Sequence, residues 1–244
     1  MPNGPQTMSD GVLLPDGTVL LINGARRGCG GGYQADIPVL VPIIYNDSAP
    51  AGSKFTNMPA TTIPRLYHSV AILLATGEVL VSGSNPSVSY SALGGVPSGW
   101  PRFDQNGHLG ALYQQQYNIS YYPTEYRVEI FSPPYMDAAI ALKPIVISSP
   151  IAIGYNTVFQ IQARKSTSTR LMGVTKFSLV HPGFHTHGQA MGQRMISLGF
   201  TATANSFAFN ITGPRDASVM PPGQYMLFVL SDGIPSTAVW VNLA

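Results

Sequence analysis

Residues 14–24 read Leu-Pro-Asp-Gly-Thr-Val-Leu-Leu-Ile-Asn-Gly, and this stretch decides the fold. Its Pro-Asp-Gly lies between two short apolar runs, where glycine supplies the positive φ that a tight hairpin turn needs. The pattern returns sixty residues later in residues 70–83, where Gly77 takes the place of Gly17 and Val79 that of Val19. A repeat of strand hairpins at this spacing indicates propeller blades of about four strands each. The sequence therefore predicts two blades of a β-propeller.

A more polar extended segment follows each hairpin, at residues 37–45 and at residues 126–131. Two blades are too few to close a ring, since propellers usually contain about four to eight. Either the chain is a C-terminal fragment of a larger propeller protein, or it pairs with something that supplies the other blades, and we expect missing N-terminal blades. We assign residues 1–138 to this partial propeller. Its long irregular loop at residues 85–122 is rich in aromatic residues, which either line a binding face or pack on one another.

The pattern changes after Ser132-Pro133-Pro134, and short alternating runs then continue to the end of the chain. There are about seven of them, at residues 144–149, 158–162, 176–180, 194–198, 206–211, 224–230 and 238–243. About seven short strands separated by turns are typical of an immunoglobulin-like β-sandwich. The sequence predicts this second domain at residues 139–244, and it predicts no helix of any length, so the whole chain is expected to be all-β.

Composition excludes several classes of protein. Charged residues make up only 10% of the chain and hydrophobic residues 45%, which is the profile of a turn-rich globular protein and not of a disordered one. The net charge is +2 and no basic cluster is present, so nucleic acid is not an expected partner. No apolar run reaches the length of about 18 residues that a membrane span needs.

Three Asn-x-Ser/Thr sequons, at Asn46, Asn118 and Asn210, favour a secreted glycoprotein, although the residues after Met1 do not form a signal peptide. The single cysteine, Cys29, excludes an internal disulfide. We interpret it as a loop cysteine without a chemical role. The alternative is a reactive thiol beside Arg26 and Arg27.

Two segments carry candidate metal ligands. Tyr67 and His68 come directly before an apolar run, and His185 and His187 lie in a loop between two predicted sandwich strands. Each pattern also has a structural explanation: Tyr67 as a core aromatic, His68 as a hydrogen-bonded residue at a strand end, and the loop histidines as solvated side chains. His-x-His on an extended segment places both imidazoles on one face, so either could reach a metal. Imidazole and phenol donors with few carboxylates suit copper better than calcium or magnesium.

These residues lie within motifs that resemble the glyoxal oxidase and galactose oxidase family of copper radical oxidases. The most specific are Arg65-Leu-Tyr-His-Ser69 and the pair Thr186-His187 followed by Gln193-Arg194. Further similar stretches lie at residues 14–24, 62–64, 82–86, 123–135 and 230–236. The resemblance spans nearly the whole chain and is closer to glyoxal oxidases. It implies late kelch blades followed by the family's C-terminal immunoglobulin-like (early set) domain.

The resemblance also implies a site. Tyr67 matches the family's axial tyrosine, which acts as a base, and His68 matches the first histidine ligand of a single copper ion. His187 matches the second histidine, with His185 as its rival. The family's cysteine-linked tyrosine, which carries the radical, belongs to earlier blades, and Cys29 lies in the wrong blade to contribute to it.

The implied activity is oxidation of an aldehyde or primary alcohol, with reduction of O₂ to H₂O₂. Because the cysteine–tyrosine cofactor is absent from this chain, we expect the chain alone to bind copper weakly and to be inactive. The alternative hypothesis is a non-catalytic propeller and sandwich module that binds carbohydrate or protein.

Overall fold

The computed structural model describes residues 3–32, 34–86, 122–138, 142–166, 171, 175–203 and 207–244. This part of the chain consists of β-strands joined by turns, with one 3-10 helix, η1 (Pro134–Asp137). It contains no helix long and apolar enough to cross a membrane. Most of the predicted loop at residues 85–122, including the sequon at Asn118, lies outside the described residues.

The first blade is an antiparallel sheet in the order β1-β2-β5-β6. Its strands are β1 (Asp10–Leu13), β2 (Val19–Ile22), β5 (Ile43–Tyr45) and β6 (Phe55–Asn57). The predicted hairpin forms β1 and β2, and its turn is closed by a hydrogen bond of 3.0 Å from Gly17 N to Leu14 O. Gly17 has φ +100°, a conformation that only glycine adopts readily.

The second blade repeats the first. It contains β7 (Val70–Leu73), β8 (Val79–Ser82) and β9 (Glu129–Phe131) in that order. Leu73 pairs with Val79 as Leu13 pairs with Val19, so the sequence repeat is also a repeat of register.

The outer segments differ from the prediction. Residues 37–45 do not form one extended segment, because β4 (Ala35–Pro38) pairs with β3 (Ala25–Gly28) whereas β5 pairs with β2. Pro42, which has no N–H to donate to a sheet, lies directly before β5. Of residues 126–131, only β9 is strand.

Most of the described residues from 142 to 244 form two facing sheets. One has the order β10-β12-β18-β17, and the other has the order β11-β21-β19-β13-β16 with β20 beside β19. Their bounds are β10 (Pro144–Ser148), β11 (Ala152–Ile153), β12 (Val158–Lys165), β13 (Thr175–His181), β16 (Arg194–Ser197), β17 (Phe200–Ala202), β18 (Ala208–Thr212), β19 (Gly223–Ser231), β20 (Ile234–Pro235) and β21 (Val239–Leu243). All seven predicted runs correspond to strands of these sheets. Our proposed domain boundary, between residues 138 and 139, falls between η1 and β10.

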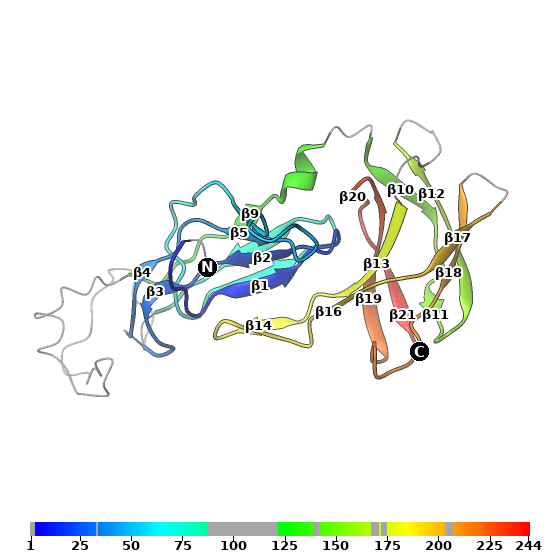
Figure 1. Cartoon of the computed structure of the whole chain (residues 1–244). Coiled ribbons are helices and arrows are strands. Elements are labelled where there is room, and N and C mark those ends of the chain that lie inside the picture. The colour runs from blue at the N-terminus through cyan, green and yellow to red at the C-terminus, as the bar shows by residue number, and fades with distance from the viewer. Residues whose placement is uncertain are drawn as a thin grey trace, which may run out of the picture.

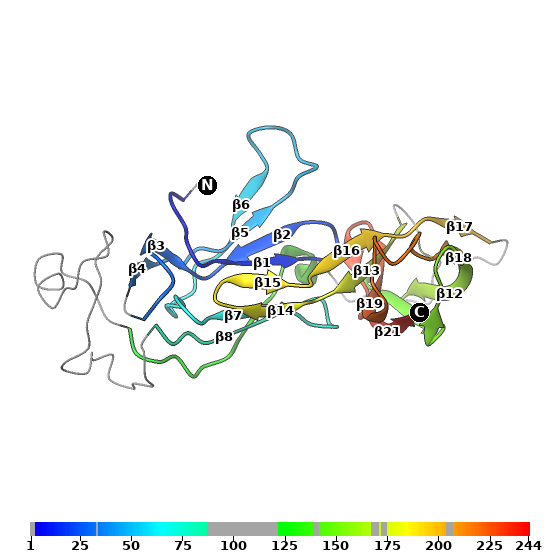
Figure 2. The same cartoon turned by 90° about the horizontal axis from the view of Figure 1, so that it is seen from below.

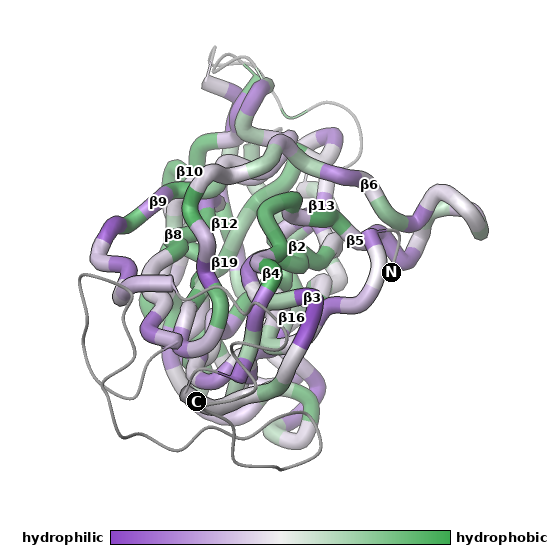
Figure 3. The backbone as a smooth tube through the Cα atoms, turned by 90° about the vertical axis from the view of Figure 1, so that its left-hand side faces the viewer, coloured by the Kyte–Doolittle hydropathy of each residue, from purple (hydrophilic) through white to green (hydrophobic). Residues whose placement is uncertain are grey.

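Blades and sandwich pack together in one apolar cluster, which is separate from the core between the two sandwich sheets. Val12, Leu20 and Val79 from the blades pack in the same buried cluster as Met226 and Phe228 from β19. Figure 1 shows the two parts side by side, with the sheet that contains β13, β16 and β19 on the side of the sandwich that faces the blades. In Figure 3 the strands that enter this cluster, such as β2, are hydrophobic, whereas β3 at the periphery is hydrophilic.

One hairpin leaves the sandwich and extends along the blades. It consists of β14 (Phe184–Thr186) and β15 (Gln189–Met191), and it lies between β1 and β7 (Figure 2). The sequence predicts a loop here, whereas the structure forms a two-stranded hairpin.

A buried hydrogen bond across the junction provides a test of its energetics. Ser178, which is 1% exposed, donates its hydroxyl to Pro15 O at 2.7 Å. Ser178→Ala leaves that carbonyl without its partner, so we expect the free energy of unfolding to fall by about 1–3 kcal/mol. Denaturant unfolding measures this. Ser53 makes the same kind of bond, to Pro50 O at 3.0 Å, on the surface. Ser53→Ala should cost about 0.5 kcal/mol or less, and equal losses in the two variants would contradict the prediction.

Candidate metal centre

Tyr67 and His68 project from a tight turn that leads into β7. Ser69 closes the turn, since its hydroxyl donates to Leu66 O at 2.8 Å. Leu66 is fully buried below the turn, while Tyr67 is half-buried and His68 is exposed above it. His68 has φ +62°, in the left-handed region that non-glycine residues rarely adopt. The bond to Leu66 and the buried Leu66 side chain fix this uncommon conformation.

The neighbouring Arg65 holds this turn in place from below. Its side chain is 1% exposed and forms an ion pair with Glu129 at 2.8 Å. The same guanidinium donates to the carbonyls of Gly83 and Arg127, and the Arg65 carbonyl accepts a hydrogen bond from Gly24 N at 2.8 Å. The turn that carries Tyr67 and His68 is thus connected to both blades.

Hydrogen bonding orients the His68 ring. Its Nδ1 lies 3.0 Å from Asn85 O. A carbonyl only accepts, so Nδ1 carries the proton and Nε2 presents a lone pair. Asn85 N in turn donates to Tyr67 O at 3.0 Å, so residues 67, 68 and 85 form one connected unit.

The segment beside Asn85 carries a strongly ionised carboxylate. Hydrogen bonds from the Arg127 side chain lower the pKa of Glu125 to about 2, and Glu125 N donates to Ser84 O at 2.8 Å. The ion pair between Glu125 and Arg127 therefore persists at any pH near neutral, and the backbone hydrogen bond to Ser84 holds this segment beside Asn85.

His187 reaches the same place from the sandwich. Thr186 pairs with Gln189, so His187 and Gly188 form a two-residue turn between β14 and β15. Both have positive φ, +56° and +72°, as the favoured type of hairpin turn requires. A side chain at position 188 would come within 2.8 Å of Met8 Cα, so glycine is needed where the hairpin tip meets the blade.

The three predicted residues come together. Ring centroids are 3.9 Å apart for Tyr67 and His68, 4.7 Å for His68 and His187, and 5.4 Å for Tyr67 and His187. Two imidazoles bound to one metal through bonds of about 2 Å have ring centres roughly 4–5 Å apart when the bonds are perpendicular. The described residues contain no group of three His, Cys, Asp or Glu suited to a metal. In this cluster the third side chain that carries a possible donor atom is a phenol.

His185 does not join the cluster. Its side chain is only 1% exposed, and its Nδ1 lies 3.3 Å from Asp10 Oδ1. The prediction that His185 and His187 share one face is wrong, because the strand ends at Thr186 and His187 belongs to the turn. His181 lies farther back, at the end of β13, with its Nδ1 3.0 Å from Gly192 O.

Cys29 is exposed in the glycine-rich loop after β3, with its sulfur 3.0 Å from Gln34 Oε1. The loop borders the cluster, since a side chain at Gly30 would lie 3.5 Å from the Tyr67 ring. This loop therefore belongs to the surroundings of Tyr67, a contact that the sequence pattern does not predict.

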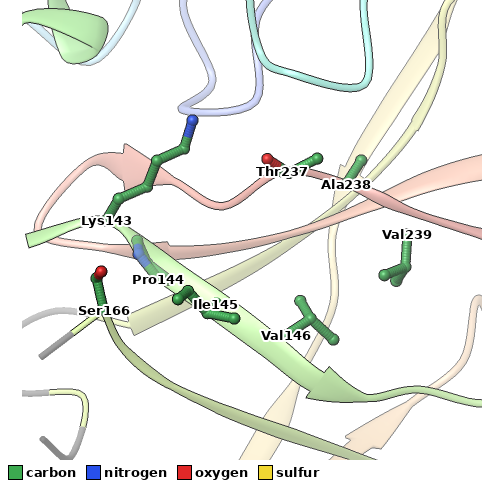
Figure 4. A pocket seen from close by; sticks show the side chains of 8 residues that line it. All are labelled: Lys143, Pro144, Ile145, Val146, Ser166, Thr237, Ala238 and Val239. Atoms are coloured by element: carbon green, nitrogen blue, oxygen red, sulfur yellow. The ribbon is translucent and has the colours of Figure 1, made fainter. Parts of the chain in front are cut away.

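A separate cavity of about 380 Å³ lies between β10 and the start of β21, and Figure 4 shows Val146 and Val239 on its wall. Its lining contains none of the residues of the ring cluster. The cavity is therefore not part of the candidate metal centre.

Comparison with known proteins supports the resemblance. Residues 1–98 match the family model described as the glyoxal oxidase N-terminus, and residues 143–243 match the galactose oxidase-like early set domain. The aldehyde oxidase GLOX1 of Arabidopsis thaliana is 33% identical over 98% of this chain and 36% of its own length. The aldehyde oxidase GLOX of Vitis pseudoreticulata is 34% identical over 100% of this chain and 42% of its own. The chain thus spans about two fifths of these relatives.

Galactose oxidase of Gibberella zeae is 29% identical over 98% of this chain and 29% of its own length. Among solved structures, a fungal alcohol oxidase in complex with copper has a TM-score of 0.72 and 23% identity, covering 98% of this chain and 42% of that one. This likeness shows the fold. Together with the family models it confirms the predicted class, propeller blades followed by an immunoglobulin-like sandwich.

Arg65 provides the test of how the turn is held. Arg65→Met removes a buried guanidinium together with its hydrogen bonds to two backbone carbonyls and to Glu129, whose side chain is 32% exposed. It should therefore lower the free energy of unfolding by about 1.5–3 kcal/mol. Arg215 is the control, because its pair with Asp216 is exposed on both sides, at 77% and 44%. Arg215→Met should cost less than about 1 kcal/mol. Denaturant unfolding compares them, and a similar cost for both would show that Arg65 does not hold the turn.

Proposed function

Because the chain belongs to the glyoxal oxidase and galactose oxidase family, we propose that it is part of a copper radical oxidase in which Tyr67, His68 and His187 hold one copper ion. The observation that carries the proposal is the contact of these three rings, since His187 is far from the adjacent residues Tyr67 and His68 in the sequence. Two imidazoles and a phenol form a donor set suited to copper.

Each residue has a defined part. His68 offers Nε2, because Asn85 O fixes the proton on Nδ1. His187 has Thr186 Oγ1 at 2.7 Å from its Nδ1, and this hydroxyl can accept from Nδ1–H and leave Nε2 as the donor atom. Tyr67 lies against both imidazoles and offers its phenol oxygen as the third donor.

With its family cofactor, copper supplies oxidation of an aldehyde or primary alcohol by two electrons, with O₂ reduced to H₂O₂. The phenol oxygen of Tyr67 would accept the proton that the substrate loses. In this proposal the cysteine-linked tyrosine belongs to propeller blades outside these 244 residues, so the chain alone is inactive.

The proposed setting is extracellular. Asn46 is exposed in a turn, where its side chain accepts a hydrogen bond from Ser48 N at 3.0 Å. Asn210 lies in β18 and is half-buried. Of these two sequons, Asn46 is the better placed for a glycan, which suits a secreted protein.

Copper binding tests the ligand set. We expect the chain to bind one Cu(II). His68→Ala and His187→Ala should each weaken binding by more than about tenfold, because each removes a donor atom. The comparison is loss of a residue that only orients a ligand, which typically weakens binding by about 10–100-fold. Tyr67→Phe should alter the Cu(II) absorption spectrum. Tyr45→Phe is the control, since the Tyr45 hydroxyl bonds to exposed Asp47 and its ring packs against Phe55. Isothermal titration and absorption spectroscopy give the result, and wild-type affinity in both histidine variants would overturn the proposed ligand set.

Peroxide release tests the activity. We expect the copper-loaded 244-residue chain to release no H₂O₂ with aldehydes or primary alcohols, and a longer product of the same gene that carries the other blades to release it. Turnover by the 244-residue chain would refute the proposal that the active site also needs a cysteine-linked tyrosine from blades outside these residues. Carbohydrate or protein binding without any copper requirement would instead favour a non-catalytic module.

A further inference from the structure

A buried hydrogen-bonded network lies behind the proposed copper ligand His187. Asp10 Oδ1 faces His185 Nδ1 at 3.3 Å, and Asp10 Oδ2 accepts a hydrogen bond of 2.8 Å from Asn23 Nδ2. The His185 and Asp10 side chains are 1% and 0% exposed, and Asn23 is 3% exposed. The network connects β14 of the hairpin to β1 and to the residue that follows β2.

Apolar packing alone does not account for an imidazole at this position. The Nε2 atom of His185 is buried and has no hydrogen-bond partner among the described residues. An unsatisfied buried polar atom costs roughly 1–3 kcal/mol, which an apolar side chain would avoid. The atom that stabilises this arrangement is therefore Nδ1 of His185. Without it, the buried carboxylate of Asp10 would have Asn23 as its single side-chain partner.

The hairpin has few other means of holding its position. Its side chains are largely exposed, including Phe184 at 71% and Met191 at 48%. Among the described residues, a second polar anchor lies at its base, where Gln193 accepts from Leu13 N at 2.7 Å and donates to Gly11 O at 2.8 Å. Since apolar burial is small, polar contacts decide where the hairpin lies on β1.

We propose that His185 is a positioning residue, which with Asp10 and Asn23 fixes the tip of the hairpin so that His187 meets His68 and Tyr67. The inference rests on the proposed function, since it assigns His187 to copper. Gln193 anchors the base of the hairpin and His185 anchors its tip, only two residues from the ligand. His185, the rival ligand in the sequence, thus acts through His187 and does not touch the metal.

The experiment compares His185→Leu with His185→Asn. Asparagine places an amide N–H close to the position of imidazole Nδ1, so it can restore the bond to Asp10, whereas leucine cannot. For His185→Leu we expect Cu(II) affinity to fall by about 10–100-fold, as for other residues that orient a ligand, and the electron paramagnetic resonance spectrum of bound Cu(II) to change. For His185→Asn we expect affinity and spectrum close to wild type.

Two controls separate positioning from general destabilisation. Ser178→Ala weakens the junction without touching the hairpin tip, and it should leave Cu(II) affinity unchanged. Hydrogen exchange of the metal-free protein should show faster exchange at residues 184–191 in His185→Leu alone.

The outcomes for the two proposals are distinct. If His68→Ala and His187→Ala abolish copper binding while His185→Leu changes neither affinity, spectrum nor exchange, the positioning role is overturned and the proposed function stands. If Ser178→Ala lowers affinity as much as His185→Leu, the effect is one of stability, and the positioning role is likewise overturned. If the wild-type chain binds no copper, the proposed function fails and the inference fails with it.

Discussion

The candidate site depends on the ion pair and hydrogen bonds that the buried guanidinium of Arg65 makes. A charge in this position is tolerated only because its donors are satisfied: Glu129 accepts from it, as do two backbone carbonyls of the second blade. Through its own carbonyl the same residue accepts from Gly24 of the first blade. Two residues later the chain presents Tyr67 and His68. The contacts of Arg65 that join the two blades therefore also fix the position of Tyr67 and His68.

Both histidines of the cluster have positive φ, and each for its own structural reason. His68 lies in the turn that Ser69 closes onto Leu66, and His187 is the first residue of a two-residue hairpin turn. Left-handed non-glycine residues cost roughly 1–3 kcal/mol and persist only where the surroundings dictate the backbone. For His68 these surroundings are the contacts of Arg65, and for His187 they are the hairpin and its Gly188. The strain is thus concentrated where the rings meet.

The sequence predicts the strands whose side chains alternate between buried and exposed positions. The two propeller hairpins and the seven sandwich runs follow from apolar patterns and glycine turns, and all of them form strands. The β14–β15 hairpin was missed because its side chains are mostly exposed and carry no apolar alternation; its one signal was His-Gly at the turn. The position of His185 away from the ring cluster could not be predicted from the sequence, because it depends on Asp10, which lies 175 residues away along the chain.

The cluster joins two parts of the chain, so its geometry depends on how firmly those parts are joined. Val180, Met226, Phe228 and Leu230 of the sandwich pack in one buried cluster with the strands of both blades, so the junction behaves as a continuous core and not as a hinge. The hairpin departs from the end of β13, one residue beyond Val180 in that core. Its root is therefore fixed by apolar packing, and its tip by polar contacts to β1. A site built across such a junction can keep His187 against His68 by protein contacts alone, which is the preorganisation that a metal centre needs.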